Sequence, residues 1–264
     1  MTIATTGRSQ SEVAREWIGL SRPAHKSRMH LIAFPYAGGG ASVYRRWQND
    51  LAHAKWLDFT VLQLPGRETR IRERPHNDLA QLLKELEWAV GAAVDRPYAL
   101  FGYSMGALLA YELAVRLAES HAAPERLLVA ARCPPWRNRH RPAAIPSRDA
   151  LLAWVRRLGA TATELLDTDL FIERFLPTLE ADIRIVDGFA RDVPQILPCP
   201  IDAFSSDDDA EVSIDDMRCW ETAAGSGFRL HRLGGGHFFL HRSHNELIAL
   251  INQILGSHAS SGGR

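Results

Sequence analysis

The sequence has few cysteines, no excess of charge of either sign and no apolar run of membrane-spanning length. Its three cysteines, Cys133, Cys199 and Cys219, form neither a C-x-x-C pair nor a metal-ligand spacing, and an odd number argues against a disulfide framework. Lys and Arg together number 31, as do Asp and Glu, so the chain lacks the basic footprint of a nucleic-acid-binding protein. No stretch approaches the roughly 20 apolar residues of a membrane span. We therefore expect no metal site, no nucleic-acid partner and no membrane insertion.

Both ends of the chain are polar. Residues 1–24 are rich in Ser and Thr and lack the apolar core of a signal peptide, so we expect a disordered N-terminal tail. Residues 257–264 are expected to form a disordered C-terminal tail. Together with the missing disulfide framework, this composition predicts a soluble protein of the cytoplasm.

Apolar runs alternate with amphipathic segments between these ends. The 46% apolar composition suffices for one α/β domain with a full core, over residues 25–256. Asp78 is the expected N-cap of a helix that runs to about residue 94. Strands are predicted at 29–34, 59–64, 97–101, 126–131, 200–204 and 228–233. This alternation predicts a mostly parallel sheet with helices on both faces.

The alternation breaks between about residues 133 and 195, where no strand is predicted. Helix-like segments occur at 147–158, 163–166 and 170–188. We interpret this stretch as a helical lid inserted into the domain. Its main apolar residues are Leu151, Leu152, Trp154, Val155, Leu158, Phe171, Phe175 and Leu176. They either form a small core of the lid itself or line an acyl channel.

The segment Gly102-Tyr-Ser-Met-Gly106 reads G-x-S-x-G between a predicted strand and an amphipathic helix. Strand, sharp turn and helix form the context of a nucleophile elbow. Side chains at positions 102 and 106 would collide with the neighbouring strand and helix, which accounts for the two glycines. Ser104 is therefore the candidate nucleophile, and the alternative is an ordinary glycine-rich turn.

A serine hydroxyl is a weak nucleophile and needs a base. His237 is the candidate, because it follows a predicted strand on a glycine-rich loop. Of the other histidines, His231 within the strand is expected to be structural, whereas His241 and His244 on the following helix are expected to face solvent.

The third member of such a site orients the imidazole and stabilises its charged form. An acidic turn after the predicted strand at 200–204 supplies Asp209 as the favoured carboxylate and Asp208 as the alternative. The order Ser104, Asp209, His237 is the order found in α/β-hydrolases.

An oxyanion that forms during acyl transfer needs two backbone donors. The N–H of Met105, directly after the nucleophile, is the first candidate. The N–H of Ala37, in the loop after the strand at 29–34, is the second. The alternative for the three glycines 38–40 is a mobile surface loop, and the phosphate-binding pattern G-x-x-x-x-G-K-[ST] is absent.

Four segments together resemble a known family, the type II (external, editing) thioesterases of nonribosomal peptide and polyketide synthesis. They are Phe34-Pro-Tyr-Ala-Gly-Gly-Gly40 with Tyr44 and Trp47, Gln63-Leu-Pro-Gly-Arg-Glu68, Gly102-Tyr-Ser-Met-Gly-Ala107 and Gly235-Gly-His-Phe-Phe-Leu240. The lid segment Leu176–Asp182 also resembles the family pattern, and the match covers about residues 30–255.

The resemblance implies an α/β-hydrolase fold and hydrolysis of acyl groups from the phosphopantetheine arm of acyl- or peptidyl-carrier proteins. Such hydrolysis clears misprimed or stalled units in antibiotic biosynthesis. The family nucleophile maps to Ser104, its base to His237 and its carboxylate to Asp209, while the oxyanion donors map to Met105 and Ala37. The resemblance implies no cofactor, and it favours a monomer.

Some positions depart from the family pattern. Tyr103 stands where histidine is frequent, Ser205-Ser206 where glycines are usual, and Glu180 where arginine is common. Carrier proteins are typically acidic, so a basic rim is expected. The segment 67–74, with four arginines, is either a solvated loop or a docking patch for such a partner.

Three other functions remain open from the sequence. A lidded carboxylesterase would use the same residues on free esters, although the combined Gln63–Arg67 and lid signature argues against it. An acyltransferase shares fold and triad, because the pocket selects the acceptor. A non-catalytic binding protein of the same fold would require a broken triad or a blocked oxyanion loop.

Overall fold

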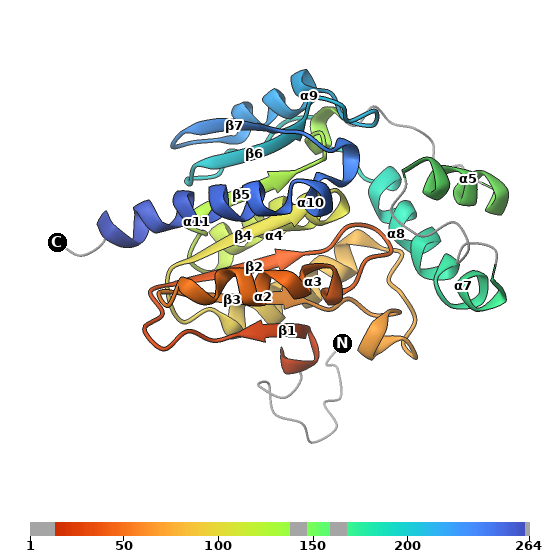
Figure 1. The fold of residues 1–264 in the computed structure, drawn as a ribbon, viewed down its shortest axis with the longest axis horizontal. Coiled ribbons are helices and arrows are strands. Elements are labelled where there is room, and N and C mark those ends of the chain that lie inside the picture. Colours follow the sequence, from red (N-terminus) through yellow and green to blue (C-terminus); the bar gives the residue numbers. More distant parts are fainter. Residues whose placement is uncertain (1–13, 138–146, 159–167, 262–264) are drawn as a thin grey trace.

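The computed structural model describes residues 14–137, 147–158 and 168–261. Its centre is a seven-stranded sheet in the order β1-β3-β2-β4-β5-β6-β7, in which β1 is antiparallel to β3 and all other neighbours are parallel (Figure 1). The strands are β1 (Ile18–Arg22), β2 (Met29–Phe34), β3 (Leu57–Leu62), β4 (Tyr98–Tyr103), β5 (Arg126–Ala130), β6 (Ile201–Ser206) and β7 (Phe228–Leu233). The predicted α/β class and mostly parallel sheet are confirmed.

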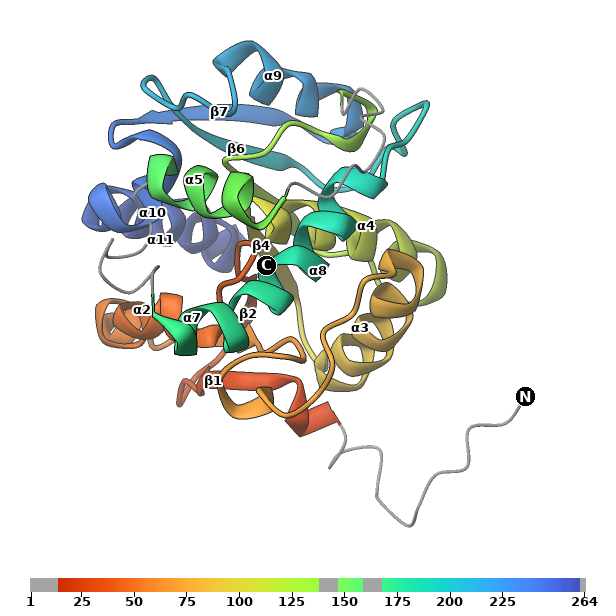
Figure 2. The same ribbon diagram turned by 90° about the vertical axis from the view of Figure 1, so that its right-hand side faces the viewer.

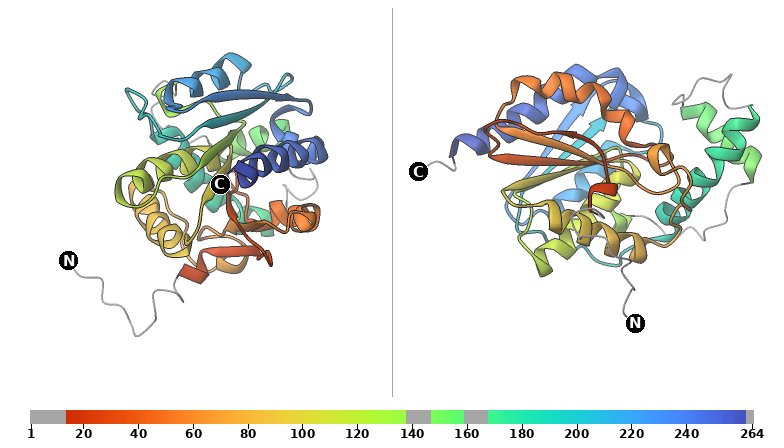
Figure 3. Two further views of the ribbon diagram at one scale, coloured as in Figure 1. Left: turned by 90° about the vertical axis from the view of Figure 1, so that its left-hand side faces the viewer. Right: turned by 90° about the horizontal axis from the view of Figure 1, so that it is seen from below.

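Helices cover both faces of the sheet, with α3 and α4 on one side and α2 and α11 on the other (Figure 3). The α-helices are α2 (Arg45–Asp50), α3 (Leu79–Ala93), α4 (Met105–Ser120), α5 (Arg148–Leu158), α7 (Asp169–Arg174), α8 (Leu176–Gly188), α9 (Ile214–Arg218), α10 (Phe239–Arg242) and α11 (His244–Ser261). The short 3-10 helices are η1 (Ala41–Tyr44), η2 (Leu51–His53), η3 (Glu68–Arg70), η4 (Pro135–Arg137), η5 (Cys219–Ala223) and η6 (Gly236–Phe238).

Each face of the sheet has its own hydrophobic core. Leu100 of β4 packs in the core under α3 and α4, and its neighbour Phe101 packs in the core under α2 and α11. Successive side chains of a strand point to opposite faces, so a strand buried on both faces is apolar throughout. This is why β2, β4 and β5 could be predicted as short apolar runs. The N-cap prediction also holds, because the Asp78 side chain accepts a hydrogen bond from Gln81 N at 2.8 Å.

The expectation of a disordered tail over residues 1–24 is wrong for its second half. Residues 18–22 form β1, which pairs with the edge of β3, and Trp17 beside it is buried. Burial of that indole and the backbone pairing offset the entropy of ordering a polar segment. The expected C-terminal tail is also wrong for residues 257–261, because α11 continues to Ser261.

The predicted insertion lies at one end of the sheet, where α5, α7 and α8 lie across the molecule (Figure 2). The helices expected at 147–158 and 170–188 are present, the second as α7 and α8. The helix-like segment 163–166 and the Phe171 side chain lie outside the described residues. The insertion has a small core of its own, formed by Leu151, Leu152, Val155, Leu176 and Leu179.

Candidate active site

Ser104 occupies the sharp turn between β4 and α4, with φ 52° and ψ −115°. A positive φ is strained for a residue with a side chain and is typical of functional turns. The two flanking glycines make the turn possible. A Cβ on Gly102 would lie 2.1 Å from Gly106 O, and one on Gly106 would lie 2.3 Å from Phe34 O. A side chain at either position would therefore collide as predicted, and the two glycines allow the sharp turn that carries the half-buried Ser104.

The two predicted oxyanion donors lie at the start of α4 and in the loop after β2. Met105 is the first residue of α4, so its N–H has no partner within the helix. Ala37 is followed by Gly38, whose φ is +74° and whose N–H donates to Asp182 Oδ2 at 2.7 Å. Within the described part of the chain, the Ala37 N–H donates to no other group. Ala37, rather than Gly38, therefore has an amide free for a substrate oxyanion.

His237 and Asp209 are brought together by the loops after β7 and β6. His237 Nδ1 lies 3.0 and 3.1 Å from the two oxygens of Asp209, whose side chain is only 1% exposed. Asp209 Oδ1 also accepts from the backbone N–H groups of Glu211 and Val212, at 2.8 and 3.2 Å. These bonds hold the carboxylate still. Its contact with Nδ1 leaves Nε2 as the imidazole nitrogen available to a substrate or to Ser104.

Asp208, the alternative carboxylate, has a different set of partners. Its Oδ1 accepts from Ser206 Oγ at 2.6 Å and from the N–H groups of Gly235 and Gly236 at 3.1 and 2.9 Å. The bonds from Ser206 and then Gly236 lower the pKa of Asp208 below its ordinary value. Asp208 thus shapes the glycine loop before His237, and Asp209 is the aspartate that meets the imidazole.

Ser104 and His237 share no hydrogen bond among the described residues. Their segments are nevertheless tied together by Tyr103, directly before the serine. The Tyr103 hydroxyl donates to the His237 carbonyl at 2.5 Å and accepts from Leu240 N at 3.3 Å. Catalytic hydrogen bonds often form only with substrate bound. The tyrosine that departs from the family pattern therefore fixes the loop that carries the imidazole.

The remaining histidines near the site divide as follows. His231 has a structural partner as expected, because its Nε2 lies 2.7 Å from the buried Asp202. The solvent-facing prediction for His244 is wrong. His244 is buried, and its Nε2 lies 2.5 Å from Asp50 Oδ2 at the end of α2. A helix face that packs on the sheet can hold a histidine when a carboxylate supplies its partner.

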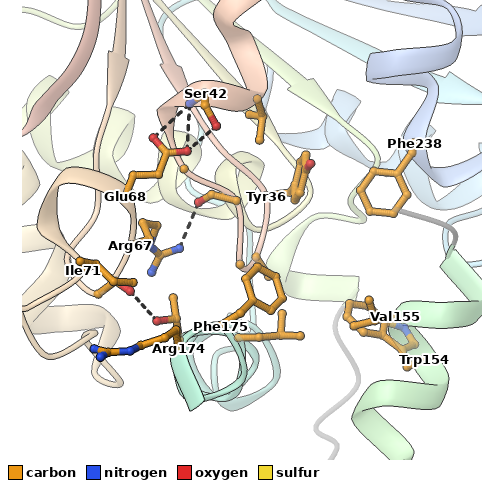
Figure 4. Close-up of a pocket in the computed structure, with 18 residues that line it drawn as sticks. Tyr36, Ser42, Arg67, Glu68, Ile71, Trp154, Val155, Arg174, Phe175 and Phe238 are labelled. Carbon is orange, nitrogen blue, oxygen red and sulfur yellow. Dashed lines mark hydrogen bonds between the residues drawn. The ribbon is translucent and has the colours of Figure 1, made fainter. Parts of the chain in front are cut away.

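A pocket of about 330 Å³ opens beside the Ala37 loop (Figure 4). Its walls come from the loop after β2, from the segment around Glu68 and from the insertion helices. Its apolar side chains are Tyr36, Val43, Ile71, Trp154, Val155, Phe175, Leu179 and Phe238. Ala37 of the oxyanion loop and Phe238 line the pocket, and the Phe238 ring lies 5.4 Å from that of His237, whereas Ser104 and His237 themselves do not line it. Some of the insertion's apolar residues thus line a pocket as well as forming their own core.

The expectation that the segment 67–74 is a solvated loop or a docking patch is wrong for Arg67. Its side chain is 6% exposed and forms two parallel bonds to Asp182, at 2.6 and 2.9 Å. Arg70 is also engaged, since it pairs with Glu73 and lies over the Trp17 ring. Arg72 and Arg74 are exposed. Sequence reasoning missed Asp182, for which the only signal was the family-like segment Leu176–Asp182.

Within the described residues, no group of three or more His, Cys, Asp or Glu side chains is arranged to hold a metal ion. All three cysteines are free thiols. No helix in the described ranges is both long and apolar enough to cross a membrane.

Comparison with known proteins places this site in a family. The thioesterase domain family matches residues 29–255. The medium-chain S-acyl fatty acid synthase thioesterase of Homo sapiens is 30% identical over 226 residues, covering 82% of each chain. The protein named linear gramicidin dehydrogenase LgrE, from Brevibacillus parabrevis, is 30% identical over 253 residues, covering 92% of this chain and 93% of its own.

Among solved structures, the type II thioesterase BorB from the borrelidin biosynthetic cluster superimposes with a TM-score of 0.81. It is 35% identical, and the match covers 90% of this chain and 97% of BorB. The chain belongs to the thioesterase domain family and has the α/β-hydrolase fold of the type II thioesterases, as its sequence motifs predicted.

Proposed function

We propose that this protein hydrolyses acyl thioesters on the phosphopantetheine arm of carrier proteins, through an acyl-Ser104 intermediate. The observation that carries the proposal is the buried Asp209 against His237 Nδ1, on loops tied to a strained Ser104. A type II thioesterase is among the solved structures that this chain resembles, which supports the carrier-bound substrate.

The first half of the reaction transfers the acyl group to the enzyme. His237 Nε2 takes the proton from Ser104 Oγ as that oxygen attacks the thioester carbonyl. The carbonyl oxygen becomes an oxyanion, which accepts from the N–H groups of Met105 and Ala37. The tetrahedral intermediate collapses, the C–S bond breaks, and the imidazolium of His237 gives its proton to the departing thiolate.

The second half frees the enzyme. His237 takes a proton from a water molecule as that water attacks the acyl-serine, and the same two backbone N–H groups hold the second oxyanion. Collapse breaks the bond to Ser104 Oγ, which recovers its proton from His237, and a carboxylic acid leaves. Asp209 keeps its charge throughout and stabilises the imidazolium in both halves.

The proposal includes removal of misprimed or stalled acyl groups as the biological role. We also propose that the protein is a monomer and that it acts in the cytoplasm. The free thiols of all three cysteines suit a reducing compartment, and the mass in solution tests the monomer. For the carrier, the exposed Arg72 and Arg74 offer a small basic surface beside Ile71 at the pocket.

The experiment that tests this function compares the wild type with Ser104→Ala. The substrates are acetyl- and longer acyl-phosphopantetheinyl carrier proteins, the matched N-acetylcysteamine thioesters and a p-nitrophenyl ester. We expect the largest kcat/KM on the carrier-bound thioesters and its loss in Ser104→Ala. Turnover confined to simple esters would favour a carboxylesterase, and faster transfer to an added alcohol or amine than to water would favour an acyltransferase.

A further inference from the structure

The strongest unexplained feature outside the triad is a buried ion pair between the loop after β3 and the insertion. Arg67 and Asp182 are 6% and 1% exposed and are held by a two-pronged contact. A buried ion pair adds little net stability, because desolvation offsets the attraction, and apolar contacts can anchor a helix equally well. Anchoring the insertion alone therefore does not account for these two charges.

The same carboxylate also holds the oxyanion loop. Asp182 Oδ2 accepts from both Arg67 Nη1, at 2.6 Å, and Gly38 N, at 2.7 Å. The Gly38 N–H belongs to the peptide that joins Ala37 to Gly38. Fixing this peptide fixes the backbone on the carboxyl side of Ala37, whose own N–H is the second oxyanion donor of the proposed function.

Arg67 extends this hold along the loop. Its Nη1 also donates to Gly39 O at 3.3 Å, and Gly39 N closes a turn on Tyr36 O at 2.9 Å. Arg67 is itself held in place, because its carbonyl accepts from the buried Gln63 side chain at 3.2 Å. The hydrogen bonds at residues 36, 38 and 39 thus leave the Ala37 amide as the free donor of the turn.

The insertion packs on the same loop through apolar groups. A Cβ on Gly38 would lie 2.6 Å from the Phe175 ring and 3.3 Å from Leu179. Gly38 has φ +74°, a conformation that glycine adopts without strain. The loop after β2 is therefore held against α8, so its backbone conformation depends on the position of that helix.

We propose that Arg67 and Asp182 are positioning residues that set the Ala37 N–H for oxyanion binding and couple that geometry to α8. The inference rests on the proposed function for the role of Ala37. We call the Arg67–Asp182 ion pair the clamp. The inference predicts that loss of the clamp weakens transition-state binding for every acyl substrate, because the oxyanion hole is shared by all of them.

The first test is Asp182→Asn, which keeps the size of the side chain and removes its charge. We expect kcat to fall by about 10- to 100-fold, less than the roughly 10²- to 10³-fold typical of deleting an oxyanion donor, with KM within about threefold of the wild type. The fall should be similar on a thioester and on a p-nitrophenyl ester. Affinity for an alkylboronic acid, which forms a tetrahedral adduct with the serine, should fall in parallel.

A second variant separates positioning from stability. In Arg67→Met/Asp182→Leu, two apolar side chains replace the ion pair, which typically preserves or raises stability, but no acceptor for Gly38 N remains. We expect a folded enzyme with the same reduced kcat. The matched control is Asp202→Asn, which breaks another buried ion pair, to Arg126. Asp202 lies in β6, away from the Ala37 loop, so this variant should lose thermal stability and keep its kcat.

Three results would overturn the inference: wild-type kcat in a folded clamp variant, a loss confined to KM, or an equal loss of kcat in Asp202→Asn. The ester and boronic acid assays need no carrier protein. An enzyme that turns over the ester but not the carrier-bound thioester would refute the proposed substrate and still decide the role of the clamp.

Discussion

The carboxyl edge of the sheet and the inserted helices are built by different kinds of contact. At the edge, backbone geometry dominates: Ser104 is held at positive φ by two glycines that tolerate no Cβ, and Asp209 is held by backbone N–H groups. Among the described residues, the insertion has a small core of its own and meets the rest of the domain through side chains: Ile185 and Val186 pack in the core under α3 and α4, and Asp182 bonds to the Ala37 loop. The difference indicates that the edge fixes the chemistry, whereas the insertion shapes the pocket and, through Asp182, holds the Ala37 loop.

The largest effect should come from the aspartate at the edge. Asp209→Asn removes the charge that stabilises the His237 imidazolium, and we expect kcat to fall by roughly 10³- to 10⁴-fold. Asp208→Asn is its matched control, because it alters a neighbouring carboxylate that, in the described part of the chain, bonds to the glycine loop and Ser206 and not to His237. We expect that control to lose less than about tenfold. Steady-state kinetics of both variants on one ester decide the matter, and a larger loss in Asp208→Asn would reverse the assignment.

Two glycine-to-alanine substitutions, one at the edge and one in the insertion, compare how strongly each region constrains its backbone. Gly106→Ala places a Cβ 2.3 Å from Phe34 O, so we expect a loss of about 3 kcal/mol or more in the free energy of unfolding. Gly188→Ala, at the end of α8, meets nothing within 4 Å and should gain about 0.5 to 1 kcal/mol. Urea denaturation measures both. Equal effects at the two positions would contradict the contrast between a sterically fixed edge and a looser insertion.

Tyr103→Phe should give a smaller effect at the edge. It removes the hydroxyl bonded to the His237 carbonyl and Leu240 N, so we expect about 1 kcal/mol less stability and a three- to tenfold lower kcat. Tyr44→Phe is the matched control, because its buried hydroxyl donates to Phe34 O and, among the described residues, forms no hydrogen bond with the His237 loop. That control should lose similar stability and keep its kcat. A kcat unchanged in Tyr103→Phe would show that the loop needs no such tie.

The smallest effect should come from the insertion's pocket wall. Trp154→Ala removes an apolar surface of the pocket, so we expect KM for an octanoyl thioester to rise by about three- to tenfold. KM and kcat for the acetyl thioester should change by less than about twofold. Trp56→Ala removes a half-buried indole that packs under α11, away from the pocket, and serves as the control. Equal changes for both acyl lengths would exclude the pocket from acyl binding.

The edge could be predicted from the sequence because its constraints are local. The glycines at 102 and 106 flank Ser104, and the glycines at 234–236 directly precede His237, so each of these constraints acts within a few residues of the sequence. The clamp could not be found in this way, because Arg67 and Asp182 are 115 residues apart in the sequence. From the sequence, the basic segment around Arg67 is therefore expected to be a solvated loop or a docking patch.

Two other differences between the predictions and the structure, at β1 and at His244, have the same origin. The strand β1 alternates half-buried and exposed residues, and as an edge strand it is specified by its pairing with β3. His244 is polar in sequence and buried in the fold, because Asp50 of a distant helix supplies its partner. In both cases the deciding contact is made by a residue far along the chain.

The most direct test of the account is to trap the acyl-enzyme in a single turnover. Wild-type enzyme in excess is mixed with acyl-carrier protein, quenched with acid within one turnover and digested for mass spectrometry. We predict that the acyl mass appears on the peptide that contains Ser104, then decays as the free acid forms, and is absent in Ser104→Ala. Release of the acid with no acyl group on Ser104, or with the group on another residue, would contradict the account.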